Sequence, residues 1–148
     1  MAAPREISPA LSALVVREIR WGRWERLIRS NGITIDRPYG TRHPEHESII
    51  YPIDYGFVNG TLGTDGHELD VFHGSASTGL VGTLVTIDHR KGDVEFKLLF
   101  DCRPEEIYLA NGFINFDRRL MQGALVLRRP MHEVRAMVRD AASAARPG

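Results

Sequence analysis

The hydrophobic and polar positions along the chain change their pattern near residue 32. Before that point, apolar side chains recur every seven residues at Leu14, Trp21 and Ile28, the spacing of one helix face. A Ser-Pro pair at residues 8–9 is typical of a helix start, and the Asn-Gly pair at residues 31–32 is typical of a helix end. The pattern therefore predicts a helix over residues 9–29.

After residue 32, the apolar positions form short runs separated by Gly, Pro and Asp. In residues 94–100 apolar side chains alternate with Glu95 and Lys97, the period of a half-buried strand. Lys91-Gly92-Asp93, just before this run, is typical of a hairpin turn. The runs read as candidate strands are 33–35, 48–51, 56–58, 69–73, 80–88, 94–100 and 123–129.

Two further helices follow from proline positions. Pro104 precedes two glutamates, as at the start of a helix, and residues 130–145 carry Val134 and Val138 four apart. About six short strands bracketed by helices predict an α+β fold, built as a small β-barrel or strongly curved sheet with helices at its ends.

Length and composition indicate a single globular domain. The 148 residues are 43% hydrophobic and 26% charged, close to the average of soluble domains, which speaks against disorder, collagen and coiled coils. One cysteine, Cys102, excludes an intramolecular disulfide and fits a reducing cytosol. We expect it to be a small buried residue just after a strand.

No apolar run has the length to span a membrane, and residues 1–30 lack the pattern of a secretion signal. We therefore expect a cytoplasmic protein.

The formal net charge is zero, but the two signs occupy different segments. Residues 1–42 carry eight arginines and four acids, a net of +4, and residues 102–148 carry +3. Residues 43–89 hold seven acids and no Lys or Arg. The balanced total argues against a protein that holds nucleic acid or anionic membranes by bulk charge, and the acidic centre indicates where cations would bind.

The densest polar segment is Asp65-Gly-His67-Glu-Leu-Asp70-Val. A turn that leads into a strand can point several carboxylates into one cleft, and hard divalent ions take oxygen ligands of this kind. The alternative is a solvated Asp-Gly turn, because Asp-Gly is a common turn dipeptide. The spacing alone leaves both interpretations open.

Two other segments carry candidate chemistry. Tyr51 and Tyr55 lie four apart beside a proline and a glycine, where they can donate phenol hydrogen bonds to an anion or pack in an aromatic core. Glu95 and Lys97 share one face of a strand, where they can hold a metal and a phosphate oxygen or form an exposed charge pair. We favour the exposed pair for any single strand.

These segments together resemble the soluble inorganic pyrophosphatases of the single-domain, Mg²⁺-dependent type. The resemblance rests on Tyr51-Pro-Ile-Asp-Tyr55-Gly-Phe-Val, Gly60-Thr-Leu and Asp65-Gly-His-Glu-Leu-Asp70-Val, in that order. It extends over roughly residues 32–130 and includes Glu95-Phe-Lys97 as the family's later acid-x-Lys pair. It implies an OB-like barrel of five to six strands over residues 32–148, with residues 1–31 as an N-terminal helical extension.

The resemblance also implies roles for individual residues. Asp65 and Asp70 match carboxylates that bind the catalytic metals, Glu95 matches a further metal-binding acid, and Asp88 or Asp93 matches another. Lys97 matches a lysine that contacts the substrate phosphate and takes part in catalysis. The substrate-binding set that it implies is Arg42, Tyr51, Tyr55 and Lys97, and the catalytic set is Asp65, His67, Lys97 and Tyr55.

Two positions depart from the family pattern. His67 stands where the signature has its middle Asp, which is often assigned as the general base toward the attacking water. Histidine binds Mn²⁺ or Zn²⁺ and can act as a base near neutral pH, but it is a poor ligand for Mg²⁺. The family's early Lys-x-Glu would fall at residues 32–34, where neither charged residue is present.

Three hypotheses of function follow. The leading one is an enzyme that hydrolyses inorganic pyrophosphate, or a related phosphoanhydride, through metal-activated water, with Mg²⁺ as cofactor or Mn²⁺ or another divalent ion in view of His67. The alternative is a catalytically impaired relative that binds a phosphorylated ligand or partner. The third is nucleic-acid binding through the six arginines and two tryptophans of the N-terminal helix, against which we favour a solvated helix face.

The expected partners follow from the leading hypothesis. They are pyrophosphate or another phosphorylated small molecule, with neither nucleic acid nor a membrane. The resemblance implies that the protein forms a homo-oligomer.

Overall fold

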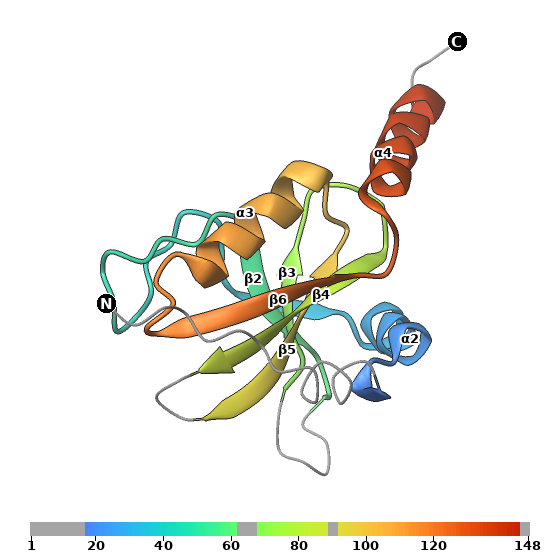
Figure 1. Ribbon diagram of the computed structural model, residues 1–148. Helices are drawn as coiled ribbons and strands as arrows, with labels where there is room; N and C mark the ends of the chain where they lie inside the picture. Colours follow the sequence, from blue (N-terminus) through green and yellow to red (C-terminus); the bar gives the residue numbers. More distant parts are fainter. Residues whose placement is uncertain (1–16, 62–67, 89–91, 146–148) are drawn as a thin grey trace.

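The computed structural model describes residues 17–61, 68–88 and 92–145 (Figure 1). Its helices are α2 (Trp21–Asn31), α3 (Pro104–Asn115) and α4 (Met131–Ala145). Its strands are β1 (Ile33–Arg37), β2 (Asp54–Val58), β3 (Asp70–His73), β4 (Leu80–Asp88), β5 (Asp93–Phe100) and β6 (Met121–Leu127). The α+β class and the number of strands agree with the prediction.

The six strands form one mixed sheet in the order β1-β2-β3-β5-β4-β6. Strands β3 and β5 are parallel, and the other neighbours are antiparallel. Strands β1 and β6 lie at opposite ends of this order, and no pairing joins them in the part of the chain that the structure describes. The predicted barrel is therefore not confirmed, because closing it requires a ladder between the two edge strands.

Two local predictions were wrong. Residues 48–51 form no strand, since only an isolated bridge joins Ile50 to Arg42 and Pro52 has no N–H for a longer ladder. The helix expected over residues 9–29 is interrupted at residues 19–20, where Arg20 leaves the helical region with φ −129° and ψ 69°. Helix α2 therefore starts at Trp21, while residues 9–16 lie outside the described part of the chain.

Helix α2 covers one face of the sheet. Its buried side chains, Trp24 and Ile28, pack against Val58 of β2, Val71 of β3 and Leu98 of β5. Glu25 of the same helix accepts a hydrogen bond from the N–H of Leu80 (2.8 Å). Its other carboxylate oxygen pairs with Arg128, which follows β6, at 3.3 Å. Apolar packing and the contacts of Glu25 thus join the helix to the sheet. The division of the chain at residue 32 stays a prediction.

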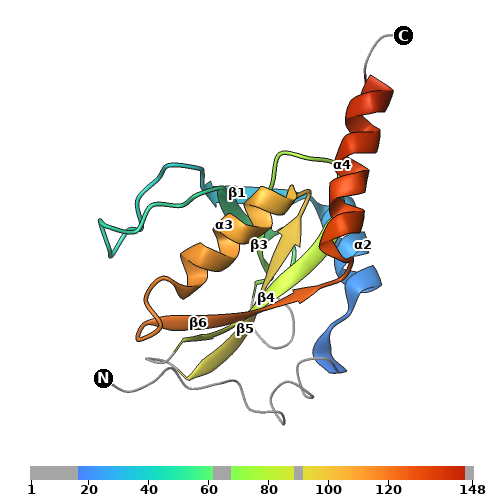
Figure 2. The ribbon, with the colours of Figure 1, turned by 45° about the horizontal axis from the view of Figure 1, so that its top comes forward.

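Helix α3 lies across the opposite face, as Figures 1 and 2 show. Its buried residues Ile107, Ala110 and Ile114 share a core with Phe72 and Leu99 of the sheet. Helix α4 adds the buried Val134 to this core and then extends away from the sheet (Figure 2). No helix in the described part of the chain has the length and apolar character needed to cross a membrane.

The two faces of strand β5 are covered by different helices. Leu98 and Phe100 face α2, whereas Lys97 and Leu99 face the side of α3. The prediction of a half-buried strand therefore fails for its second half, because all four of these residues are buried. The sheet face that carries Lys97 is the one on which the candidate site forms.

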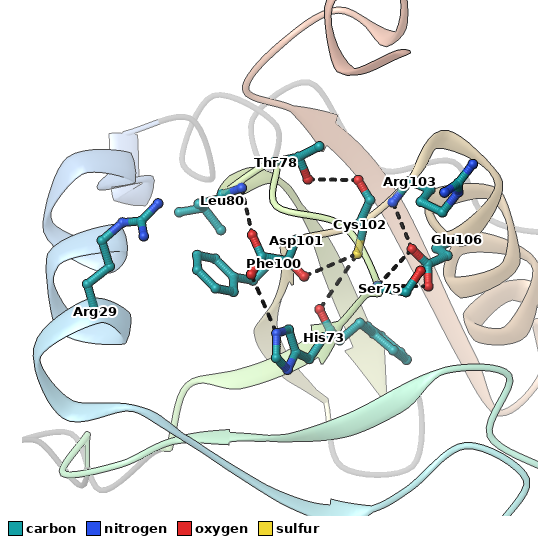
Figure 3. A network of polar contacts seen from close by, with 12 residues as sticks. Arg29, His73, Ser75, Thr78, Leu80, Phe100, Asp101, Cys102, Arg103 and Glu106 are labelled. Atoms are coloured by element: carbon teal, nitrogen blue, oxygen red, sulfur yellow. Dashed lines mark hydrogen bonds and ion pairs between the residues drawn. The ribbon is translucent and has the colours of Figure 1, made fainter. Parts of the chain in front are cut away.

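A network of polar contacts fixes the links that follow β3 and β5 (Figure 3). Asp101, just after β5, adopts a left-handed backbone with φ 55°, and its Oδ1 accepts a hydrogen bond from the N–H of Gly79 (2.8 Å). The Glu106 carboxylate accepts from the N–H groups of Ser75 and Arg103, and Thr78 Oγ1 donates to the carbonyl of Cys102. These bonds hold the β3–β4 link against the start of α3.

Cys102 is fully buried in this network, as the sequence predicted. Burial, with a smaller contribution from the nearby Glu106 carboxylate, raises the pKa of its thiol well above the ordinary value. The side chain is therefore a neutral packing group at physiological pH.

We expect Asp101→Ala to lower the free energy of unfolding by about 2 kcal/mol, because it removes the bond to Gly79 and leaves a side chain in a left-handed conformation. Asp101→Asn should cost about half as much, since asparagine tolerates this conformation and keeps an acceptor oxygen. Urea denaturation of both variants tests this. A loss for Asp101→Asn as large as that for Asp101→Ala would contradict it, because the effect would then come from the charge of Asp101, which faces His73.

Candidate functional site

The pairing of β3 with β5 places two charged side chains next to each other. In this parallel ladder Asp70 is the register partner of Lys97, and directly opposed residues project to the same face of a sheet. Tyr55 comes from β2, the antiparallel neighbour of β3, and points to the same face. Three residues that lie far apart in the sequence thus meet on the face covered by α3.

Lys97 is the centre of the resulting contacts. Its ammonium group donates hydrogen bonds to Tyr55 Oη (2.9 Å), to Asp70 Oδ2 (2.9 Å) and to Glu95 Oε2 (3.3 Å). The Tyr55 hydroxyl donates to the same Asp70 oxygen at 2.7 Å. Lys97 is only 6% exposed, whereas the Glu95 side chain is 42% exposed, so the pair is not the exposed charge pair that the strand pattern favoured.

These contacts set the protonation states of the site. Burial by itself would lower the pKa of Lys97, but its interactions with Tyr55 and Asp70 outweigh burial and hold the pKa above the ordinary lysine value. Burial raises the pKa of Tyr55, the Lys97 ammonium opposes that rise, and the net pKa is well above the ordinary tyrosine value. At neutral pH the site therefore presents an ammonium and a neutral phenol, which are both hydrogen-bond donors.

Lys97 lies at the wall of a cleft of about 390 Å³. Two of the lining residues, Arg37 and Lys97, are basic, and six are acidic. The acids are Asp36, Glu45, Glu68, Asp70, Asp88 and Glu95. An excess of four carboxylates over bases attracts cations, and a polyanion can enter this cleft only together with cations that compensate the carboxylates.

Arg37 is a site residue that the sequence reasoning missed. Its guanidinium donates a hydrogen bond to the Tyr51 hydroxyl and lies 5.4 Å from the centre of the Tyr51 ring. The alternation of Ile33 and Ile35 gives no signal for it, because an irregularity in β1 between Ile35 and Arg37 makes Arg37 the partner of Tyr55 and turns it to the face opposite Ile33. Arg42, which the resemblance favoured, is exposed and is not among the residues that line the cleft, so its role stays a proposal.

Both interpretations of the two tyrosines apply together. Tyr51 and Tyr55 are buried, their rings are 5.3 Å apart, and Tyr51 also packs against Phe113 of α3 at 4.9 Å. Their hydroxyls nevertheless reach the polar side, one to Arg37 and one to Asp70. The apolar contacts of the rings fix the positions of the two phenol groups.

The structure brings some of the expected metal ligands together. Asp70 and Glu95 meet at the Lys97 ammonium, and Asp88 lines the same cleft. Strand β5 begins at Asp93, the register partner of Asp88, and the side chain of Asp93 lies outside the described part of the structure. Asp65 and His67 lie outside the described residues.

The donor chemistry of the cleft suits a hard divalent ion, because carboxylate oxygens are its preferred ligands. Among residues 17–61, 68–88 and 92–145, however, no three His, Cys, Asp or Glu side chains are placed so that they could hold one metal ion.

Comparison with solved structures finds inorganic pyrophosphatases. The enzyme from Neisseria gonorrhoeae is 17% identical, with 78% of this chain aligned to 92% of that one at a TM-score of 0.49. The enzymes from Coxiella burnetii (14% identical, 73% and 90% aligned, TM-score 0.43) and Thermus thermophilus (18%, 76% and 88%, 0.39) are also similar. No protein-family model and no curated protein sequence matches the chain.

A double-mutant cycle tests the buried ion pair. Lys97→Met leaves the Asp70 carboxylate without its cation, and we expect it to lower the free energy of unfolding by about 3 kcal/mol. Asp70→Asn should cost less, and the double variant should cost at least 1 kcal/mol less than the sum of the two. Urea denaturation measures all three, and additive losses would show that the two groups do not interact.

Proposed function

We propose that the protein hydrolyses inorganic pyrophosphate, or a related phosphoanhydride, with the help of divalent cations. The observation that carries the proposal is the buried Lys97 ammonium at the wall of a cleft whose other charged groups are mostly carboxylates. Carboxylates alone would repel a phosphate, and bases alone would need no metal. The combination suits a substrate that enters as a complex of phosphate and metal.

Mg²⁺ is the proposed cofactor, with Mn²⁺ as the alternative that His67 favours. The proposed ligands are Asp65, Asp70, Glu95 and one of Asp88 and Asp93. Divalent ions bound there would neutralise the substrate and lower the pKa of a water molecule toward neutrality.

The chain's own donors would hold the phosphate. Lys97 keeps its proton at neutral pH because its pKa is raised, so it can donate to a phosphate oxygen throughout the reaction. The raised pKa of Tyr55 likewise keeps its hydroxyl a donor. Arg37, which also lines the cleft, can bind a phosphate through the planar fork of its guanidinium.

In the proposed reaction the oxygen of water forms a new bond to one phosphorus, and the bridging P–O bond on the opposite side breaks. The attacking water gives up a proton, for which His67 is the proposed acceptor. The electron pair of the broken bond stays on the leaving phosphate, whose added charge Lys97 and Arg37 would stabilise. Two phosphates are the products.

One observation favours a second candidate, a protein that binds a phosphorylated ligand without turnover. Lys97 already compensates both Asp70 and Glu95, and the described residues contain no three-ligand group. A site of this kind can bind a phosphorylated ligand together with a cation and still lack the arrangement of metals and water that hydrolysis requires.

Phosphate release from pyrophosphate with Mg²⁺ or Mn²⁺ tests the proposed activity. We expect Asp70→Asn to lower kcat by about 100-fold, because it removes a metal ligand and the counterion of Lys97. The matched control is Asp140→Asn, an exposed carboxylate on α4 that does not line the cleft, which should leave kcat unchanged. Wild-type release that does not exceed that of Asp70→Asn would refute the proposal.

His67→Asp separates the two candidates. If histidine at this position limits Mg²⁺ binding, the variant should hydrolyse pyrophosphate faster with Mg²⁺ and lose any preference for Mn²⁺. Rates at matched concentrations of the two metals measure this. Binding of a phosphorylated ligand with no turnover in either form would instead support the second candidate.

A further inference from the structure

A second cavity, of about 140 Å³, adjoins the carboxylate-lined cleft. Arg37, His43, Tyr55, Lys97 and Met121 line both spaces, so the two meet at the donors proposed to hold the phosphate. A ligand that binds Lys97 can therefore extend from the polar cleft into this second cavity.

The walls of the second cavity are mostly apolar and aromatic. Tyr51 and Phe113 form one aromatic pair with ring centres 4.9 Å apart. The aliphatic and aromatic members of the remaining wall are Ile49, Ile114, Phe116 and Leu120. An apolar cavity of about 150 Å³ accommodates a benzene ring, so this one has the size for a single aromatic ring.

One polar atom in this wall lacks a partner. The Nε2 atom of His46 is buried and makes no hydrogen bond to any residue that the structure describes. An unsatisfied buried polar group destabilises the protein, and a ligand with a complementary polar atom would remove that cost. The cavity thus combines aromatic side chains with several polar groups, among them the unpaired His46 Nε2 and the Asp117 carboxylate.

Pyrophosphate has neither an apolar surface nor a ring, so the apolar and aromatic wall of this cavity contributes nothing to its binding. We propose that the preferred substrate is a phosphoanhydride that carries a single heteroaromatic ring, namely a pyrimidine nucleoside diphosphate or triphosphate. The ring packs against the aromatic wall of the cavity, a polar ring atom pairs with His46 Nε2, and the phosphates reach Lys97 and Arg37. The turnover of this substrate rests on the proposed function, whereas its binding does not.

The reaction with uridine diphosphate follows the same chemistry. The water oxygen bonds to the terminal phosphorus, and the bond from that phosphorus to the bridging oxygen breaks. The products are uridine monophosphate, phosphate and one proton, so no further reactant is needed.

The test compares kcat/KM for uridine diphosphate and for pyrophosphate. Leu120→Trp fills the second cavity. We expect it to lower the ratio of kcat/KM for uridine diphosphate to kcat/KM for pyrophosphate about 10-fold. His46→Phe keeps a ring but removes the polar atom, and it should lower the same ratio. The matched control is Leu109→Trp, a half-exposed leucine on α3 outside this cavity, which should leave the ratio unchanged.

Binding of a methylene-bridged uridine diphosphate analogue, measured by calorimetry beside methylenediphosphonate, separates this inference from the proposed function. If the nucleotide analogue binds more tightly and Leu120→Trp abolishes the difference, the ring site stands even when nothing is hydrolysed. The ring site is refuted if the two analogues bind equally, or if Leu120→Trp weakens the binding of both alike. Hydrolysis of pyrophosphate in the same preparation would then still support the proposed function.

Discussion

The ion pair between Lys97 and Asp70 is the interaction on which the rest of the site depends. It forms because β3 and β5 are parallel and in a register that makes the two residues partners. An ammonium that is only 6% exposed requires a carboxylate, since an unpaired buried charge would cost several kcal/mol. Tyr55 completes the arrangement by bonding to both groups, and its ring is fixed by the core beneath α3.

The same sheet face gives rise to two different environments. Toward α3, Phe72, Leu99 and Tyr51 form an apolar core. The small cavity lined by Phe113 lies at the edge of this core. Beyond the cover of the helix, carboxylates from several segments gather around the cleft. Lys97 lines both spaces, so a ligand with one charged and one apolar end matches this surface better than a ligand of one kind.

The sequence predicted the parts of the molecule that local patterns determine. Strand β4 was predicted over its full span of residues 80–88. The motif resemblance named Lys97, Tyr55 and Asp70, whose side chains are in contact in the structure, and their roles stay predictions. The burial of Lys97 could not be predicted from the strand alternation, because it depends on the pairing of β5 with β3. Two further features also depend on long-range strand pairing and could not be predicted. They are the lack of pairing between the edge strands β1 and β6 among the described residues, and the position of Arg37 after an irregularity in β1.

A crystal structure with Mn²⁺ and imidodiphosphate tests the central claim, that the carboxylates and Lys97 form one site for a phosphate–metal complex. The account predicts anomalous Mn²⁺ peaks bound by Asp70 and Glu95, with a phosphate oxygen within hydrogen-bonding distance of Lys97 Nζ. An analogue that binds elsewhere, or a cleft without Mn²⁺ at saturating concentrations, would contradict it.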